Sequence, residues 1–157
     1  MSKTVIVGTE EYQVPVEGEN PGYGSDLTDF FVAVADALST VQRPNDIIQT
    51  SANIANNVTS FTNIPGFSFD TSEVRSINSK FLITRSTDVP ATTLCEDGYI
   101  EGNYDGSNWT IAIRSNNNSG VEFNITPAGQ VQYKSTELLG SNYSGEIQFE
   151  AKVFNKL

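Results

Sequence analysis

The sequence predicts a mainly β protein: a single antiparallel β-sandwich or jelly-roll-like domain, preceded by an N-terminal hairpin or arm and one amphipathic helix. In the C-terminal two-thirds of the chain, apolar and polar residues alternate in runs that are separated by turns rich in Gly, Asn, Pro and Ser. Period-two alternation of this kind is typical of half-buried antiparallel strands. One stretch with helical spacing lies ahead of these runs and predicts the helix.

The length of 157 residues suits one domain with a small appendage, and nine Phe and six Tyr are enough for one core. We expect a hairpin and linker that form an attachment arm over residues 1–24, an amphipathic helix over 25–43 and the β-sandwich over 46–157.

Residues 3–15 have the pattern of a β-hairpin, with a turn expected at Gly8–Glu11. An isolated two-stranded hairpin is marginally stable in water, so this one is expected to dock on another surface. The residues that we expect to attach to a partner are Val5, Val7, Tyr12 and Val14.

The helix is expected to begin near Ser25, a good N-cap, and to end before Pro44. Its apolar residues recur at helical spacing and form one stripe. The stripe has two plausible uses, packing across one end of the β domain or self-association around an axis. For self-association the candidates are Phe30, Val34, Leu38 and Val41.

Seven or eight strands are expected after residue 46. In chain order, the expected features are a strand at 46–50, a strand within 52–62 with a turn at Asn56-Asn57, a turn at Pro65-Gly66, a run over 73–84, a loop over 88–93, a run over 94–104, a hairpin turn at Asp105-Gly106, a run over 108–113, and runs that begin at Val121, Val131 and Ile147.

Alternation also predicts which residues of each run share a face. These are Arg75, Ile77, Ser79, Phe81 and Ile83; Trp109, Ile111 and Ile113; Val121, Phe123 and Ile125; Val131 and Tyr133; and Ile147, Phe149, Ala151 and Val153.

The net charge of −10, with nine scattered basic residues, argues against binding to nucleic acid or to an anionic membrane. It suits a soluble protein or one that docks on a basic protein surface. No apolar run approaches transmembrane length and no secretory signal is read at the N-terminus, so we expect a protein made in a cytoplasm.

The residue types argue against an enzyme and against a cofactor or metal site. The chain has no His and a single Cys, so Ser–His–Asp, Cys–His and Cys-rich zinc sites cannot be built. Cys95 stands beside Glu96 and Asp97, whose charges disfavour a thiolate, and a buried or inert thiol is expected.

Three weaker alternatives stay open. Glu101, Asp105 and Glu122 could supply paired carboxylates for glycoside hydrolysis. Tyr99, Tyr104 and Tyr133 could line a sugar-binding groove, and the loop Asn103–Asn108 has the oxygen-rich composition of a calcium loop, although a plain hairpin turn explains it better.

Three stretches of the chain resemble small virion structural proteins of tailed bacteriophages. They are VIVGTEEYQVPVEGENPGYGSDLTDFFVAVADAL at the N-terminus, IPGFSFDTSEVRSINSKFLITRST, and SGVEFNITPAGQVQYKSTELLGSNYSGEIQFEAK. The first is similar to a short hairpin–linker–helix module that begins many phage head-fibre, decoration and tail-fibre chains. In the other two, FSFD, VRS and GQVQY follow one another in the order found in a β domain of phage particle proteins.

The resemblance implies a phage virion structural protein with no enzyme activity and no cofactor, and it does not itself choose between head and tail. The short chain, the hairpin that needs a partner, the candidate self-association helix and the single β domain favour a capsid decoration (cement) or head-fibre subunit that binds the outer particle surface. Its partner would be a phage capsid or other virion protein, and the chain would form a homo-oligomer, with a trimer favoured. Its location would be the virion, assembled in the host cytoplasm. The alternatives are a tail-fibre or baseplate component, and a carbohydrate- or host-surface-binding module that uses Tyr99, Tyr104 and Trp109.

Overall fold

The structure is a computed structural model that describes residues 3–7, 10–14, 31–34 and 45–157. The chain divides into two units, Met1–Gln42 and Arg43–Leu157. In the first unit, β1 (Lys3–Val7) pairs antiparallel with β2 (Glu10–Val14), which confirms the hairpin. The second strand begins at Glu10, so the turn is shorter than predicted. Residues 31–34 are helical, and the rest of the predicted helix lies outside the described residues.

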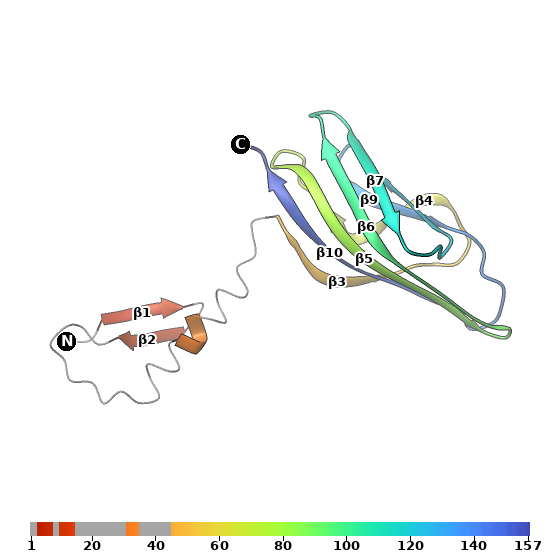
Figure 1. The fold of residues 1–157 in the computed structure, drawn as a ribbon, viewed down its shortest axis with the longest axis horizontal. Coiled ribbons are helices and arrows are strands. Elements are labelled where there is room, and N and C mark those ends of the chain that lie inside the picture. The colour runs from red at the N-terminus through yellow and green to blue at the C-terminus, as the bar shows by residue number, and fades with distance from the viewer. Residues whose placement is uncertain (1–2, 8–9, 15–30, 35–44) are drawn as a thin grey trace. The chain divides into compact units, whose positions relative to one another are not determined.

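The second unit is a β-sandwich of eight strands in two antiparallel sheets, as the sequence predicts (Figure 1). The five-stranded sheet has the order β3 (Ile47–Asn53), β10 (Ser144–Asn155), β5 (Val74–Asp88), β6 (Ala91–Tyr104) and β7 (Trp109–Ser115). The three-stranded sheet has the order β4 (Val58–Ser68), β9 (Gln130–Ser135) and β8 (Val121–Ile125).

The core lies between the facing sides of the two sheets, and the predicted alternation places its residues there. Along β5, buried and exposed residues alternate from Ile77 to Ile83, and all four predicted residues of β10 are buried. The ring of Phe67 stacks on that of Phe149, with centroids 4.1 Å apart, and Phe81 meets Phe123 edge-on. One aromatic pair of each kind therefore links the two sheets directly.

Two residues of β6 and β7 are more exposed than the sequence predicts. Trp109 and Ile111 pack against the core, but Ile113 on the same face is 41% exposed, because β7 is an edge strand of the wider sheet. Cys95 is exposed and not buried, because the core face of β6 carries Glu96 and the residues that alternate with it.

The predicted turn at Pro65-Gly66 is wrong, because both residues lie within β4. Between its pairs with Gln132 and Gln130, β4 takes five residue steps where β9 takes two, so the strand carries a large bulge. Gly66 makes the bulge possible with a φ of +76°. The side-chain amide nitrogen of Gln130 (Nε2) lies within hydrogen-bond distance of the backbone carbonyls of Ile64 (3.0 Å), Phe67 (3.1 Å) and Val131 (2.8 Å).

The β5–β6 and β6–β7 turns are tight. Asp88 pairs with Ala91, so the loop predicted over 88–93 shrinks to Val89 and Pro90. At the predicted Asp105-Gly106 turn, Asp105 Oδ1 accepts hydrogen bonds from the backbone N–H groups of Ser107 (2.7 Å) and Asn108 (2.8 Å). The loop suggested as a calcium site is therefore a hairpin turn closed by its own carboxylate.

Gln130→Ala tests the role of this side chain in holding the β4 bulge. The substitution leaves the carbonyls of Ile64 and Phe67 without their amide donor, so we expect the free energy of unfolding to fall by roughly 2–4 kcal/mol. The control is Gln132→Ala on the same strand, whose side-chain amide bonds only other side chains, those of Asn63 and Asn124, and no backbone carbonyl. Urea denaturation of both variants measures the difference, and equal losses would contradict this role for Gln130.

Two turn carboxylates titrate below their ordinary range. The hydroxyl and backbone N–H of Ser72 hold the pKa of Asp70 below 3.8, and the N–H groups of Asn108 and Ser107 do the same to the pKa of Asp105. A lowered folded-state pKa gives stability that is present above the ordinary pKa and is lost as the pH falls through the folded value. In an NMR titration, Ser72→Ala should raise the pKa of Asp70 and leave that of Asp105 unchanged. An unchanged Asp70 would refute the assigned cause.

Candidate functional site

The four predicted attachment residues occupy one face of the hairpin. The register pairs Val5 with Tyr12, Lys3 with Val14 and Val7 with Glu10. Because residues directly opposite one another share a face and alternate residues return to it, Val5, Val7, Tyr12 and Val14 belong to the same face. Their assignment to attachment stays a prediction.

Of the four residues predicted for self-association, one, Val34, lies within the described residues. Val34 is partly buried within the helical residues 31–34, whereas Phe30, Leu38 and Val41 lie outside the described residues. Phe31 and Val32, which are not on the predicted stripe, are 61% and 54% exposed. Self-association through this helix stays a prediction.

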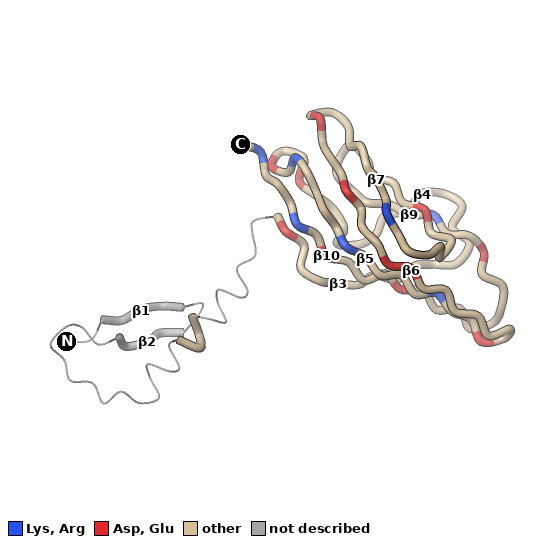
Figure 2. The backbone as a smooth tube through the Cα atoms, viewed as in Figure 1, with Lys and Arg blue, Asp and Glu red and all other residues tan. Residues whose placement is uncertain are grey.

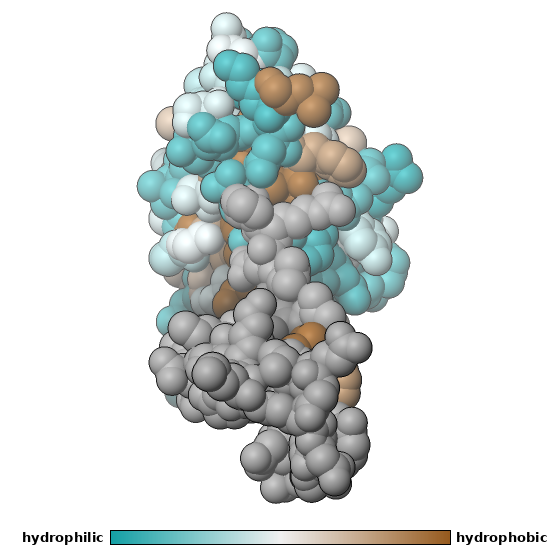
Figure 3. All heavy atoms as spheres, turned by 90° about the vertical axis from the view of Figure 1, so that its left-hand side faces the viewer, coloured by the Kyte–Doolittle hydropathy of each residue, from teal (hydrophilic) through white to brown (hydrophobic). Residues whose placement is uncertain are grey.

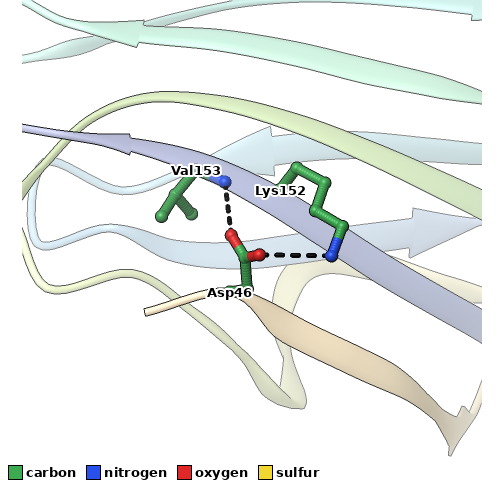
Figure 4. Close-up of polar contacts among 3 residues, drawn as sticks. All are labelled: Asp46, Lys152 and Val153. Atoms are coloured by element: carbon green, nitrogen blue, oxygen red, sulfur yellow. Dashed lines mark hydrogen bonds and ion pairs between the residues drawn. The ribbon is translucent and has the colours of Figure 1, made fainter. Parts of the chain in front are cut away.

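The chain enters the sandwich at a buried carboxylate (Figure 4). Asp46, directly before β3, accepts a hydrogen bond from the backbone N–H of Val153 (2.8 Å) and one from Lys152 Nζ (3.2 Å). Its side chain is 2% exposed, while that of Lys152 is 74% exposed, so the ion pair is screened and the backbone bond is the stronger constraint. Asp46 thus fastens the start of β3 to the end of β10.

The opposite end of the sandwich is organised by one buried cation, Arg85, whose side chain is fully inaccessible. It continues the core face of β5 beyond Ile83. Its Nε donates to the hydroxyl of Tyr143 (3.0 Å), its Nη1 to the carbonyl of Ser119 (2.6 Å), and its Nη2 to Asn56 Oδ1 (3.0 Å). Nη2 also donates to the carbonyl of Thr136. Every acceptor comes from a connection between strands and none from a strand.

A buried carboxylate balances this charge through a single bridging residue. Glu96 Oε2 accepts hydrogen bonds from the backbone N–H (2.7 Å) and the hydroxyl (2.6 Å) of Ser119, whose carbonyl accepts from Arg85. Both Glu96 and Ser119 are buried. The two charges are therefore linked by Ser119, and charge-assisted hydrogen bonds of this kind are the strong ones.

The partners of Arg85 are themselves fixed. Asn56 bonds both backbone groups of Leu138, accepting from its N–H (2.8 Å) and donating to its carbonyl (2.9 Å). The hydroxyl of Tyr143 donates to the carbonyl of Ile54 (2.9 Å). We call the set of Arg85, Asn56, Glu96, Ser119, Thr136 and Tyr143 the Arg85 network. It ties together the β3–β4, β7–β8 and β9–β10 connections.

This network supports an exposed apolar pair at the tip of the sandwich. Val89 in the β5–β6 turn is 72% exposed and Leu139 in the β9–β10 connection is 68% exposed. The hydroxyl of Thr87 lies 2.9 Å from the carbonyl of Pro90 and 3.3 Å from that of Leu139, and Ser141 N–H donates to the carbonyl of Val89 (3.0 Å). The two connections thus form one surface.

The outer face of the five-stranded sheet is mixed in character. It holds an open depression of about 280 Å³, lined by Gln49, Lys80, Phe81, Leu82, Asp97, Gln148, Phe149 and Glu150. Acidic and basic residues are interspersed along the strands (Figure 2). On the face that Figure 3 presents, the visible side chains of the β domain are mostly hydrophilic. No single charge sign dominates this surface, which does not point to a charged ligand.

The structure separates the residues suggested for sugar binding. Tyr133 is buried and its hydroxyl accepts the N–H of Ala55 (2.9 Å). Tyr104 pairs with Trp109 on the core side, with ring centroids 5.3 Å apart, whereas Tyr99 alternates onto the outer face and is 46% exposed. Neither proposed aromatic trio forms one groove.

The suggested carboxylates are also apart. Glu101 pairs with Arg114 (3.0 Å) in the larger sheet, Asp105 closes its own turn, and Glu122 belongs to β8 of the other sheet. Across the described residues, no three Cys, Asp or Glu side chains gather in a group that could hold a metal ion. Among the residues that the structure describes, no helix is long and apolar enough to span a bilayer.

No protein-family model and no curated protein matches this sequence. Among solved structures, the chain is similar to the crystal structure of the Acinetobacter phage vB_ApiP_P1 tailspike protein, with 7% sequence identity and a TM-score of 0.40. The similarity covers 91% of this chain and 26% of that chain, so this chain spans about a quarter of the tailspike's length. A likeness at this level decides neither family nor function.

Arg85→Met tests whether the buried guanidinium holds the tip of the sandwich together. The variant leaves Glu96 buried without its compensating charge and removes the donors to Ser119 and Asn56, so we expect a loss of roughly 3–5 kcal/mol in the free energy of unfolding. Arg114→Met is the control, because Arg114 is 75% exposed and its removal should change stability by less than about 1 kcal/mol. Chemical denaturation compares the two, and similar losses would refute the assigned role.

Proposed function

We propose that this chain is a bacteriophage virion structural protein carried on the outside of the particle, as a capsid decoration (cement) or head-fibre subunit. The observation that carries the proposal is that the two ends of the β domain are built differently. The chain enters at Asp46 beside the end of β10, and the Arg85 network holds three connections at the opposite end. A domain built in this way can be held at one end and present the other. The resemblance of the sequence to phage particle proteins suggests that the surface holding the domain is that of a phage particle.

In this proposal the hairpin β1–β2 is the attachment element. Its two five-residue strands are too few to be stable alone in water. Docking on a capsid or other virion protein would bury the face that carries Val5, Val7, Tyr12 and Val14, or would add the hairpin to a sheet edge of that partner. The predicted helix would then gather the protomers into a homo-oligomer, with a trimer favoured.

The protein acts in this proposal by binding and assembly, without catalysis or cofactor. Its place is the virion, after assembly in the host cytoplasm. The β domain supplies a rigid body, because its polar groups at the distal tip are bonded to one another across connections far apart in sequence.

Paired substitutions in the hairpin test the attachment. Val5→Lys with Tyr12→Lys places two charges opposite each other on the proposed face, whereas Thr4→Lys with Gln13→Lys places the same two charges on a register pair of the other face. We expect the first variant to lose particle binding at least tenfold and the second to retain it. Co-sedimentation with phage particles that lack the protein, followed by cryo-EM of the decorated particles, measures binding and location.

Both variants should keep the circular dichroism of the β domain, which shows that folding is intact. Full binding by the Val5→Lys, Tyr12→Lys protein would overturn the attachment assignment. Density on the tail or baseplate would replace decoration of the head with the tail-fibre alternative, and no density on any particle would refute a virion role.

A further inference from the structure

The β domain leaves one sheet edge without the protection that its other edges have. The edge strands are β3 and β7 in the larger sheet and β4 and β8 in the smaller one. The pairing of β3 is interrupted by a bulge, β4 carries a bulge with Pro65, and β8 is five residues long with Glu122 in it. Bulges, prolines, charges and shortness are the devices that stop edge strands from pairing with other chains.

β7 has none of the bulges or prolines. Its seven residues pair with β6 in an unbroken register, and it contains neither Pro nor Gly. Its one charged residue, Arg114, is engaged by Glu101 on the neighbouring strand. Within the described residues, β6 is the strand that β7 pairs with, and its second edge is open.

The hydrogen bonds at both ends of the β6–β7 ladder show which residues face this open edge. Asp105 N–H donates to the carbonyl of Asn108, and Asn116 N–H donates to the carbonyl of Asp97, each at 3.1 Å. Bonded and non-bonded pairs alternate in an antiparallel ladder, so Thr110, Ala112 and Arg114 bond to β6. The backbone N–H and C=O groups of the intervening residues, Trp109, Ile111, Ile113 and Ser115, are therefore directed to the open edge.

The same intervening positions carry an apolar strip on the core side. Ile111 is partly buried against the core, and Ile113, on the same face, is 41% exposed. A strand added at this edge would cover Ile113 and would also satisfy the outward backbone groups. The exposed side chain and the unpaired backbone groups belong to the same strand, so a single partner strand would cover the one and bond the others.

The sequence of β7 reads almost the same in both directions at its centre, as Thr110-Ile111-Ala112-Ile113-Arg114. We propose that β7 pairs antiparallel with β7 of a second copy of this chain, across a two-fold axis at Ala112. The five strands of each copy then form one continuous sheet. Ile111 would lie opposite the second copy's equivalent of Ile113, Thr110 opposite that of Arg114, and Ala112, the smallest side chain, opposite itself.

This register satisfies the constraints together. Residues that direct backbone groups outward pair with residues that do the same, and core-side residues stay on the core side, because every pair joins two odd or two even positions. No like charges lie directly opposite each other. The contact is distinct from the predicted helix, so in a helix-linked oligomer it would join one assembly to the next. The inference does not depend on where the protein acts.

A cysteine at the axis tests the register. In the full chain with Cys95→Ser, Ala112→Cys would lie opposite its own copy in a non-bonded pair with Cα atoms about 4.5 Å apart, within reach of a disulfide. Thr110→Cys is the matched control, on the same strand and face but roughly 13 Å from its own copy. On mild oxidation we expect at least about tenfold more disulfide-linked dimer from Ala112→Cys than from Thr110→Cys. Equal yields overturn the proposal.

A charge at the edge tests the association itself. Ile113→Lys removes the apolar pair and should raise the dissociation constant of the two-fold contact at least about tenfold, which corresponds to about 1.4 kcal/mol. Thr84→Lys, an exposed position on β5 in the middle of the sheet, adds the same charge and should leave association unchanged. Sedimentation equilibrium over a range of protein concentrations measures both.

Equal association of the two lysine variants and the wild type overturns the proposal. A monomer whose own hairpin covers β7, or an edge used by a different protein, would give neither the cross-link nor the mass change, and either finding also overturns it. If Ile113→Lys does not fold by circular dichroism, the cysteine pair decides alone. All of these measurements use purified protein, so their failure is distinguishable from failure to bind a phage particle.

Discussion

The burial of the Arg85 guanidinium is the constraint on which the closed end of the sandwich depends. A charge removed from water is tolerated only when its N–H groups are satisfied and its charge is balanced. Here the acceptors are supplied by Asn56, Ser119, Thr136 and Tyr143, which belong to three connections. These connections must therefore take up their conformations together, and the tip forms as a unit.

The same charge fixes how β5 sits in its sheet. A shift of one residue would turn Arg85 outward and bring Thr84 or Ser86 to the core side, where the connections would lose their donor. Register is thus specified by a polar residue at one end of the strand and by Phe81 and Ile83 in its middle. Asp46 has the corresponding role at the other end, where its carboxylate takes the N–H of Val153 beyond the last paired residue of β3.

Alternation predicted the β class, the strand number and most of the core, because each strand buries one face. The failed turn prediction has a cause far away in sequence, where another side chain overrides the local signal. Pro65-Gly66 is a strong turn signal, but Gln130 holds the carbonyls around it inside a bulged strand. The core-facing position of Arg85 could have been predicted, because it continues the spacing of Ile77 to Ile83. Its hydrogen-bond acceptors could not, because they lie 29 to 58 positions away in sequence. The attachment and self-association residues could be chosen from apolar spacing alone, and the described residues do not test them.

The interruptions in the other edge strands support the proposal that the open edge of β7 is a pairing surface. A domain that only had to stay soluble would be expected to interrupt this strand as it interrupts β3 and β4. In the proposed function, many copies are held side by side on one particle, which raises their effective concentration for one another to the range where weak contacts are occupied. The two-fold pairing that purified protein forms in part would then be more fully occupied between neighbours once their arms are attached. Such a contact would let the β domain cement a surface while each subunit stays soluble before assembly.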